Sequence, residues 1–171
     1  MEQAMVRWLA NLVGLPADFD GQLADTASAA SLIALAAARE QAFPDVRKTG
    51  LAGLPPAVVY GSELAHSSID KACVVLGLGI SGLRKVPTDA EHRMDVAALE
   101  AAIAADRAAG RRPIAVVATA GTTAVASVDP LPAVAALCRR EGLWMHVDAA
   151  YAGAAASLPE KTTLKSRSRL L

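Results

Sequence analysis

The chain has 171 residues, the size of about one domain, and its 17 Lys and Arg residues balance its 17 Asp and Glu residues. A net charge near zero argues against nucleic acid or an acidic membrane as an electrostatic partner. Charged residues interrupt every apolar segment before it reaches the length of a membrane span, and the chain starts without a signal-peptide pattern. Cys73 and Cys138 form no CxxC pair, so we expect a protein of the reducing cytoplasm.

Segments with helical and strand character alternate along the chain. In chain order, apolar spacing and the Gly and Pro positions predict a helix over 2–13, a helix over 27–43, a strand over 57–60, a helix over 67–77, a strand over 83–86, a helix over 95–109, a strand over 113–119, a helix over 130–140 and a strand over 143–148. Alternation of this kind implies crossover connections. The predicted fold class is α/β, with a mostly parallel sheet flanked by helices.

Polar clusters follow the predicted strands or open a helix, which matters because ligands of parallel α/β sheets bind beyond the carboxyl ends of the strands. Residues 25–28 open the long helix, where free N–H groups and hydroxyls suit a phosphate. Simple helix capping by Thr26 or Asp25 is the alternative. His66 follows the first strand, where its ring would either stack on a flat ligand or cap the next helix.

The exits of the last two predicted strands carry further candidates. Residues 118–123 combine Gly121, which allows a turn, with Thr hydroxyls, although a plain strand exit has the same composition. His146 and Asp148 lie on one face of the last strand because side chains alternate along a strand. An unpaired buried carboxylate is costly, so Asp148 indicates a cationic ligand. A metal bound by the HxD pair is the weaker alternative.

Residues 77–82 match the pattern GxGxxG literally. The dinucleotide-binding fingerprint needs a strand before the glycines and a helix after them. Here a predicted helix comes before and a predicted strand after. We therefore interpret the segment as a turn between helix and strand.

Four motifs together resemble one family, the group II pyridoxal-phosphate-dependent amino-acid decarboxylases, and particularly their aromatic-L-amino-acid branch. The motifs are DTASAASLIALAAARE at 25–40, HSSIDKA at 66–72, ATAGTTAVASVDPL at 118–131 and LWMHVDAAYAG at 143–153. The resemblance covers residues 1–160 and implies part of a fold-type-I large domain, with a mostly parallel sheet. It also implies pyridoxal 5′-phosphate as cofactor, an amino-acid substrate and a homodimer. Aminotransferases and cysteine desulfurases share the fold type, but the second and third motifs speak against them.

The resemblance implies a role for each matching residue. The implied contacts are Thr26, Ala27 and Ser28 at the cofactor phosphate, His66 stacked on the pyridine ring, Thr123 near the 3′ oxygen, Asp148 at the pyridinium nitrogen and Ala150 under the ring. His66 and Asp148 would be the catalytic residues, and no metal is implied. Tyr151 favours the aromatic branch, whereas His146 would lie near the cofactor without an assigned role.

One family motif is missing from the sequence. The cofactor-binding lysine of the family sits in an Asn-Pro-His-Lys stretch that does not occur here, and the surroundings of Lys161 and Lys165 do not match it. We interpret residues 1–160 as a partial cofactor-binding domain and 161–171 as a disordered or aberrant tail. The chain alone is then expected to be inactive, with decarboxylation carried out by the complete enzyme. The alternative is a non-catalytic remnant, or an interaction module that pairs with a full-length homologue.

Overall fold

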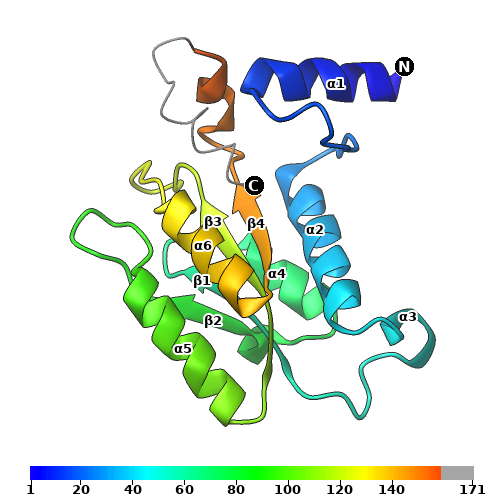
Figure 1. Ribbon diagram of the computed structural model, residues 1–171, viewed down its shortest axis with the longest axis vertical. Coiled ribbons are helices and arrows are strands. Elements are labelled where there is room, and N and C mark those ends of the chain that lie inside the picture. The colour runs from blue at the N-terminus through cyan, green and yellow to red at the C-terminus, as the bar shows by residue number, and fades with distance from the viewer. Residues whose placement is uncertain (159–171) are drawn as a thin grey trace.

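The computed structural model describes residues 1–158, and within them four parallel strands form one sheet in the order β2-β1-β3-β4 (Figure 1). The strands are β1 (Ala57–Ser62), β2 (Leu83–Val86), β3 (Arg112–Thr119) and β4 (Trp144–Asp148). The α-helices are α1 (Glu2–Val13), α2 (Ala27–Ala42), α3 (Val46–Thr49), α4 (Ser68–Val75), α5 (Val96–Ala108) and α6 (Leu131–Glu141). Two short 3-10 helices are η1 (Ile80–Gly82) and η2 (Gly153–Ser157).

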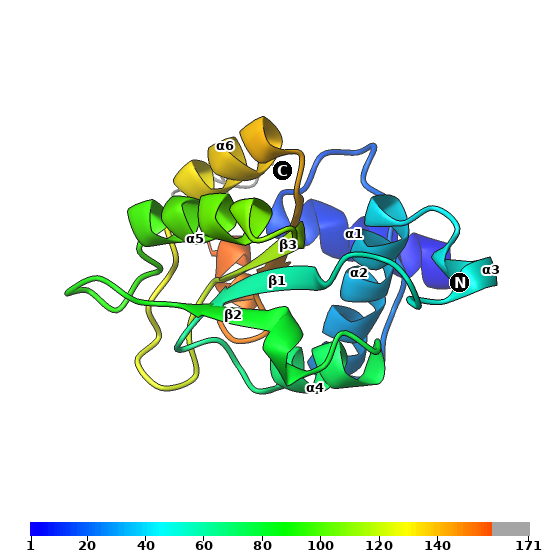
Figure 2. The ribbon, with the colours of Figure 1, turned by 90° about the horizontal axis from the view of Figure 1, so that it is seen from below.

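Helices cover both faces of the sheet, as Figure 2 shows from below. Alternate strand residues enter two separate cores: Val59 and Val117 pack with α2 and α4, whereas Val58 and Val116 pack with α5 and α6. A strand buried on both faces must be apolar throughout, which is why β3 reads as a continuous apolar run. The predicted parallel α/β architecture is confirmed.

Local sequence explains where the main helices begin and end. The Oγ1 atom of Thr26 accepts the Ala29 N–H at 3.1 Å and starts α2, and the carboxylate of Asp95 accepts the Ala98 N–H at 3.0 Å and starts α5. Gly142 ends α6 in the left-handed conformation that glycine adopts without a steric penalty.

Some boundaries differ from the prediction. β1 continues to Ser62 because Gly61 and Ser62 pair with Lys85 and Val86 of β2. The helix predicted to reach residue 77 ends at Val75, and η1 then leads into β2, so the glycine-rich segment does follow a helix and precede a strand. The short helices α3 and η2 were not predicted, because four or five residues carry no apolar period. The predicted tail, 161–171, lies outside the described residues.

β4 is an edge strand of the described sheet, and an apolar cavity of about 710 Å³ lies along it. Its walls include residues of α2, of α6 and of the loop that follows α1. Within residues 1–158, no helix combines the length and the apolar character needed to cross a membrane.

Candidate functional site

The exits of β3 and β4 meet at the carboxyl edge of the sheet. Thr119 and Asp148, the last residues of the two strands, are paired in register, and the Ala120 N–H donates to the Asp148 carbonyl oxygen at 2.8 Å. The Ala152 N–H in turn donates to the Ala120 carbonyl oxygen at 3.3 Å. Two of the predicted polar clusters, 118–123 and the end of β4, are therefore held side by side.

The first turn of α2 presents backbone donors. Thr26 caps the helix, as the alternative reading allowed, so its hydroxyl is engaged with the Ala29 N–H. The N–H groups of Ala27 and Ser28 have no intrahelical acceptor, as is general for the first residues of a helix. All three residues are exposed. The cap thus leaves these two N–H groups open to an anion, and the positive end of the helix dipole favours one.

His66 lies between β1 and α4. Its Nδ1 atom accepts the Ser68 N–H at 3.2 Å and is 2.9 Å from the Ser68 hydroxyl oxygen. A backbone N–H only donates, so Nδ1 is the acceptor and a neutral ring carries its proton on Nε2. His66 is exposed, and the start of α4 fixes one edge of its ring. The side chain therefore caps α4 and still has a ring face open to a flat ligand.

Asp148 is half-buried at the end of β4. One carboxylate oxygen, Oδ1, accepts the Ala150 N–H at 3.2 Å. Ala150 itself is exposed. Within residues 1–158 no basic side chain pairs with Asp148, so its negative charge remains available to a cationic ligand.

The two threonines after β3 have different surroundings. Thr122 is buried, and its Oγ1 atom lies 3.0 Å from the Ser127 hydroxyl and accepts the Ser127 N–H at 3.1 Å, which closes the loop. Thr123 is exposed and makes no such bond within residues 1–158. The loop is therefore held by Thr122, which leaves the hydroxyl of Thr123 unused by the fold.

A buried hydroxyl beside Asp148 supports the presence of a ligand site. Thr119 shares the α2 face of the sheet with Val117, and its Oγ1 atom is buried without a partner in the described part of the chain. Buried hydroxyls are ordinarily hydrogen-bonded. Together with Asp148 and the free N–H groups of α2, it gives this edge polar groups of the kinds that fit a phosphate and a protonated ring.

Gly121 allows the two strand exits to approach closely. Its φ is +91°, and a Cβ atom placed on it would lie 2.6 Å from the Ala152 Cβ and 3.0 Å from the Tyr151 Cδ1. Real Cβ atoms do not come that close to a carbon, so a side chain here would push apart the segments that carry Thr123 and Asp148.

Replacing Gly121 by alanine is expected to lower the free energy of unfolding by about 2–5 kcal/mol, because left-handed strain and overpacking add up. Gly110→Ala is the matched control: its φ is +73°, but nothing lies within 4 Å of the added atom. That variant should lose only about 1–2 kcal/mol. Urea unfolding of both variants measures the difference, and equal losses would show that the close approach has no energetic weight.

Asp129 is a residue that the sequence analysis left without a role. It is fully buried, and its carboxylate accepts the Met94 N–H and the Thr119 N–H, each at 2.7 Å. Burial raises the pKa of this carboxyl, while the two N–H donors act in the opposite direction. Asp129 thus fastens the end of β3 to the segment before α5. The sequence does show an acid between Val128 and Pro130, which could have been recognised as unusual. Its hydrogen-bond partners could not be predicted, because they are distant in the sequence.

Ser31, and the contact that it makes with His146, emerge only from the structure. The Ser31 Oγ atom lies 3.1 Å from the His146 Nε2 atom, so α2 is hydrogen-bonded to β4. Burial lowers the pKa of His146, and the nearby Asp148 partly opposes that shift. No group of three His, Cys, Asp or Glu side chains suited to a metal ion occurs among residues 1–158.

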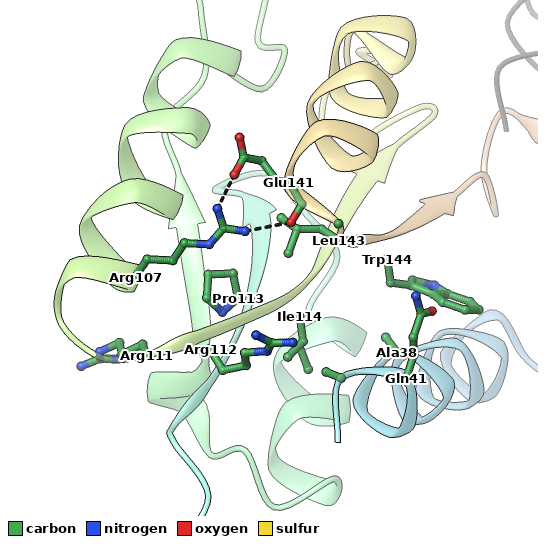
Figure 3. A pocket seen from close by; sticks show the side chains of 12 residues that line it. Ala38, Gln41, Arg107, Arg111, Arg112, Pro113, Ile114, Glu141, Leu143 and Trp144 are labelled. Atoms are coloured by element: carbon green, nitrogen blue, oxygen red, sulfur yellow. Dashed lines mark hydrogen bonds and ion pairs between the residues drawn. The ribbon is translucent and has the colours of Figure 1, made fainter. Parts of the chain in front are cut away.

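A smaller cavity of about 230 Å³ lies at the opposite edge of the sheet, where β3 and β4 begin (Figure 3). Arg107 forms an ion pair with Glu141 there and donates to the Glu141 carbonyl oxygen at 2.8 Å, which links α5 to α6. None of the residues to which the sequence assigns a site role lines this cavity. The cavity is therefore separate from the candidate site.

Comparison with known proteins identifies relatives. The model of the pyridoxal-dependent decarboxylase conserved domain matches residues 1–168. The chain is 39% identical to the aromatic-L-amino-acid decarboxylase of Bos taurus, over 94% of this chain and 35% of the relative. It is 40% identical to the cysteine sulfinic acid decarboxylase of Homo sapiens, over 90% of this chain and 31% of the relative. The chain thus spans about a third of the length of these relatives.

Solved structures agree with this result. The crystal structure of mouse CSAD superimposes with a TM-score of 0.93 and 37% identity, covering 99% of this chain and 35% of that one. The structure of Oryza sativa TDC with PLP and tryptamine gives a TM-score of 0.90 and 37% identity, covering 99% of this chain and 36% of that one. The described fold therefore matches that of about a third of the length of these enzymes.

Proposed function

The chain belongs to the family of pyridoxal-dependent decarboxylases, and we propose that the complete protein converts an aromatic L-amino acid to an amine and CO2. The observation that carries this proposal is the Asp148 carboxylate, which has no basic partner among residues 1–158 and ends a strand that is hydrogen-bonded to α2, the helix whose first N–H groups are free. An acid and an anion site on neighbouring elements match the protonated ring and the phosphate of pyridoxal 5′-phosphate, the cofactor of the family.

Asp148 would keep the ring nitrogen of the cofactor protonated. When bound, the cofactor supplies an electron sink that accepts the electrons left behind as CO2 departs. A carboxylate next to the ring nitrogen stabilises the protonated form, because opposite charges attract most strongly away from bulk water. The Ala150 N–H holds the carboxylate in place through Oδ1, and Ala150 itself would pack under the ring.

The remaining candidates would hold the rest of the cofactor. The N–H groups of Ala27 and Ser28, with Thr26 beside them, would bind the phosphate. His66, fixed at Nδ1 by the start of α4, would lay its ring on the opposite face of the pyridine. Thr123 would offer its unused hydroxyl to the 3′ oxygen. These roles come from the resemblance, and the availability of each group in the fold supports them.

The choice of an aromatic substrate rests on Tyr151, which follows β4 and lies against Gly121. Relatives with aromatic and with cysteine sulfinate substrates are about equally similar, so their similarity alone does not select a substrate. The test is to incubate the complete protein and pyridoxal phosphate with L-tryptophan, L-tyrosine, L-phenylalanine, L-cysteine sulfinate and L-glutamate and to measure CO2. Preference for the aromatic group supports the proposal. Preference for an acidic substrate would contradict it, and cofactor binding without CO2 release would favour the non-catalytic alternative.

A homodimer is the proposed assembly, and α1 offers a surface for it. None of its residues is buried, and Met5, Trp8, Leu9 and Leu12 form an exposed apolar stripe at helical spacing. Trp8 is 67% exposed. We expect Trp8→Ser combined with Leu12→Ser to weaken the dimer of the complete protein by at least about tenfold, because two large anchors are lost. Sedimentation equilibrium measures this, and an unchanged dimer would exclude this stripe from the interface.

A reducing compartment such as the cytoplasm is the proposed location. Both cysteines are buried free thiols. Burial raises the pKa of Cys73 to about 11 and that of Cys138 to about 12, so neither is poised for thiolate chemistry.

A further inference from the structure

We propose that Ser31 and His146 form a positioning pair that sets the spacing between the phosphate-binding start of α2 and the Asp148 carboxylate. This inference rests on the proposed function, because the spacing matters only if one rigid ligand binds at both places. The pair itself contacts neither the substrate nor the cofactor in this proposal.

The hydrogen bond joins two elements that are far apart in the sequence. Ser31 Oγ and His146 Nε2 are 3.1 Å apart, although 115 positions separate the two residues. Ser31 is only 2% exposed, so water competes little for its hydroxyl. The bond therefore fixes α2 directly against β4.

The hydrogen bond lies close to both proposed ligand contacts, the start of α2 and Asp148. Ser31 follows Ser28 by three residues, which is a rise of about 4.5 Å along a helix. His146 precedes Asp148 by two residues, which is about 6.6 Å along a strand, and both side chains lie on the same face. The bond thus lies within about one helical turn of Ser28 and about one two-residue strand repeat from Asp148.

The chemistry of the pair also points to positioning. Two apolar side chains could fill the same space without taking polar groups out of water, so packing alone does not call for serine and histidine. Burial keeps the pKa of His146 below its ordinary value, which favours the neutral ring, and the 3.1 Å contact with Ser31 is a directional hydrogen bond. A directional bond fixes a distance, which apolar contact does not.

Cofactor titrations of the complete apo protein test this inference. The variant Ser31→Ala removes the bond, and Ser31→Thr keeps a hydroxyl at the same place. Ser62→Ala is the matched control, since Ser62 is also buried but its hydroxyl has no partner in the described chain. Each protein is titrated with pyridoxal 5′-phosphate and with pyridoxal, which has the same ring but no phosphate to reach α2.

We expect Ser31→Ala to weaken the binding of pyridoxal phosphate about tenfold and to leave pyridoxal binding within about twofold of the unaltered protein. Ser31→Thr should restore the affinity, and Ser62→Ala should change neither ligand. His146→Phe provides a second route to the same result, and combining it with Ser31→Ala should add no further loss. Melting temperatures of the apo proteins report whether each variant is folded.

Equal losses for both ligands, or no loss for either, would overturn the positioning role, because a merely structural bond does not distinguish them. If the unaltered protein and Ser31→Ala bind pyridoxal phosphate equally well, this inference alone is overturned. An unaltered protein that binds no pyridoxal phosphate would instead overturn the proposed function.

Discussion

Replacing Asp148 by alanine in the complete protein is expected to lower the rate of decarboxylation by about 10²–10³-fold, the usual effect of removing one electrostatic stabiliser from an active site. The physical reason is that a neutral ring nitrogen draws electrons from the reacting carbon far less strongly than a protonated one. The affinity for pyridoxal phosphate should also fall, because a charge-assisted hydrogen bond of about 1.5–3 kcal/mol is lost. Release of CO2 under saturating cofactor separates the chemical effect from the binding effect.

A surface carboxylate provides the control for Asp148. Asp70 pairs with Lys85 at 2.9 Å on the outside of the molecule, and Asp70→Ala should leave turnover unchanged. Asp148→Asn should be nearly as slow as Asp148→Ala, because the amide preserves the shape but carries no charge. Turnover of Asp148→Ala close to that of the unaltered protein would exclude the role assigned to this carboxylate.

Replacing Asp129 by alanine is expected to lower the free energy of unfolding by about 2–6 kcal/mol, because two buried N–H groups lose their acceptor at about 1–3 kcal/mol each. The Met94 and Thr119 N–H groups lie in the interior, where water does not replace the carboxylate. Urea unfolding measures the loss. Since Thr119 is paired with Asp148, the variant should also bind pyridoxal phosphate more weakly even where it is folded.

The conservative change Asp129→Asn serves as the control, because its amide oxygen still accepts one of the two N–H groups. Its loss of stability should be smaller than that of Asp129→Ala. If both substitutions left stability within about 0.5 kcal/mol of the unaltered protein, the size of an ordinary surface change, the proposed fastening of β3 would be wrong.

The sheet and its helices followed from the sequence because their signals are local. The apolar run of β3 and the alanine-rich α2 each identify their element within a few residues, and the alternation of helix and strand implies the parallel order. The end of β1 was misjudged by two residues because Gly61 and Ser62 owe their strand conformation to pairing with β2, which the local sequence does not contain.

The candidate site shows the same division between local and distant signals. Asp148 and His66 stood out because a polar group at a strand exit is informative by itself. The sequence indicated either phosphate binding or helix capping for Thr26, and in the structure its hydroxyl caps the helix. Ser31 and Asp129 gave no such signal, since their hydrogen-bond partners lie elsewhere in the chain and only the fold brings them together.

A crystal structure of the complete protein with pyridoxal 5′-phosphate tests the central claim most directly. The account predicts the ring nitrogen within hydrogen-bond distance of the Asp148 carboxylate, the His66 ring stacked on the pyridine and the phosphate at the N–H groups of Ala27 and Ser28. A cofactor bound away from the carboxyl edge of the sheet, or a ring nitrogen that faces a group other than Asp148, would contradict it.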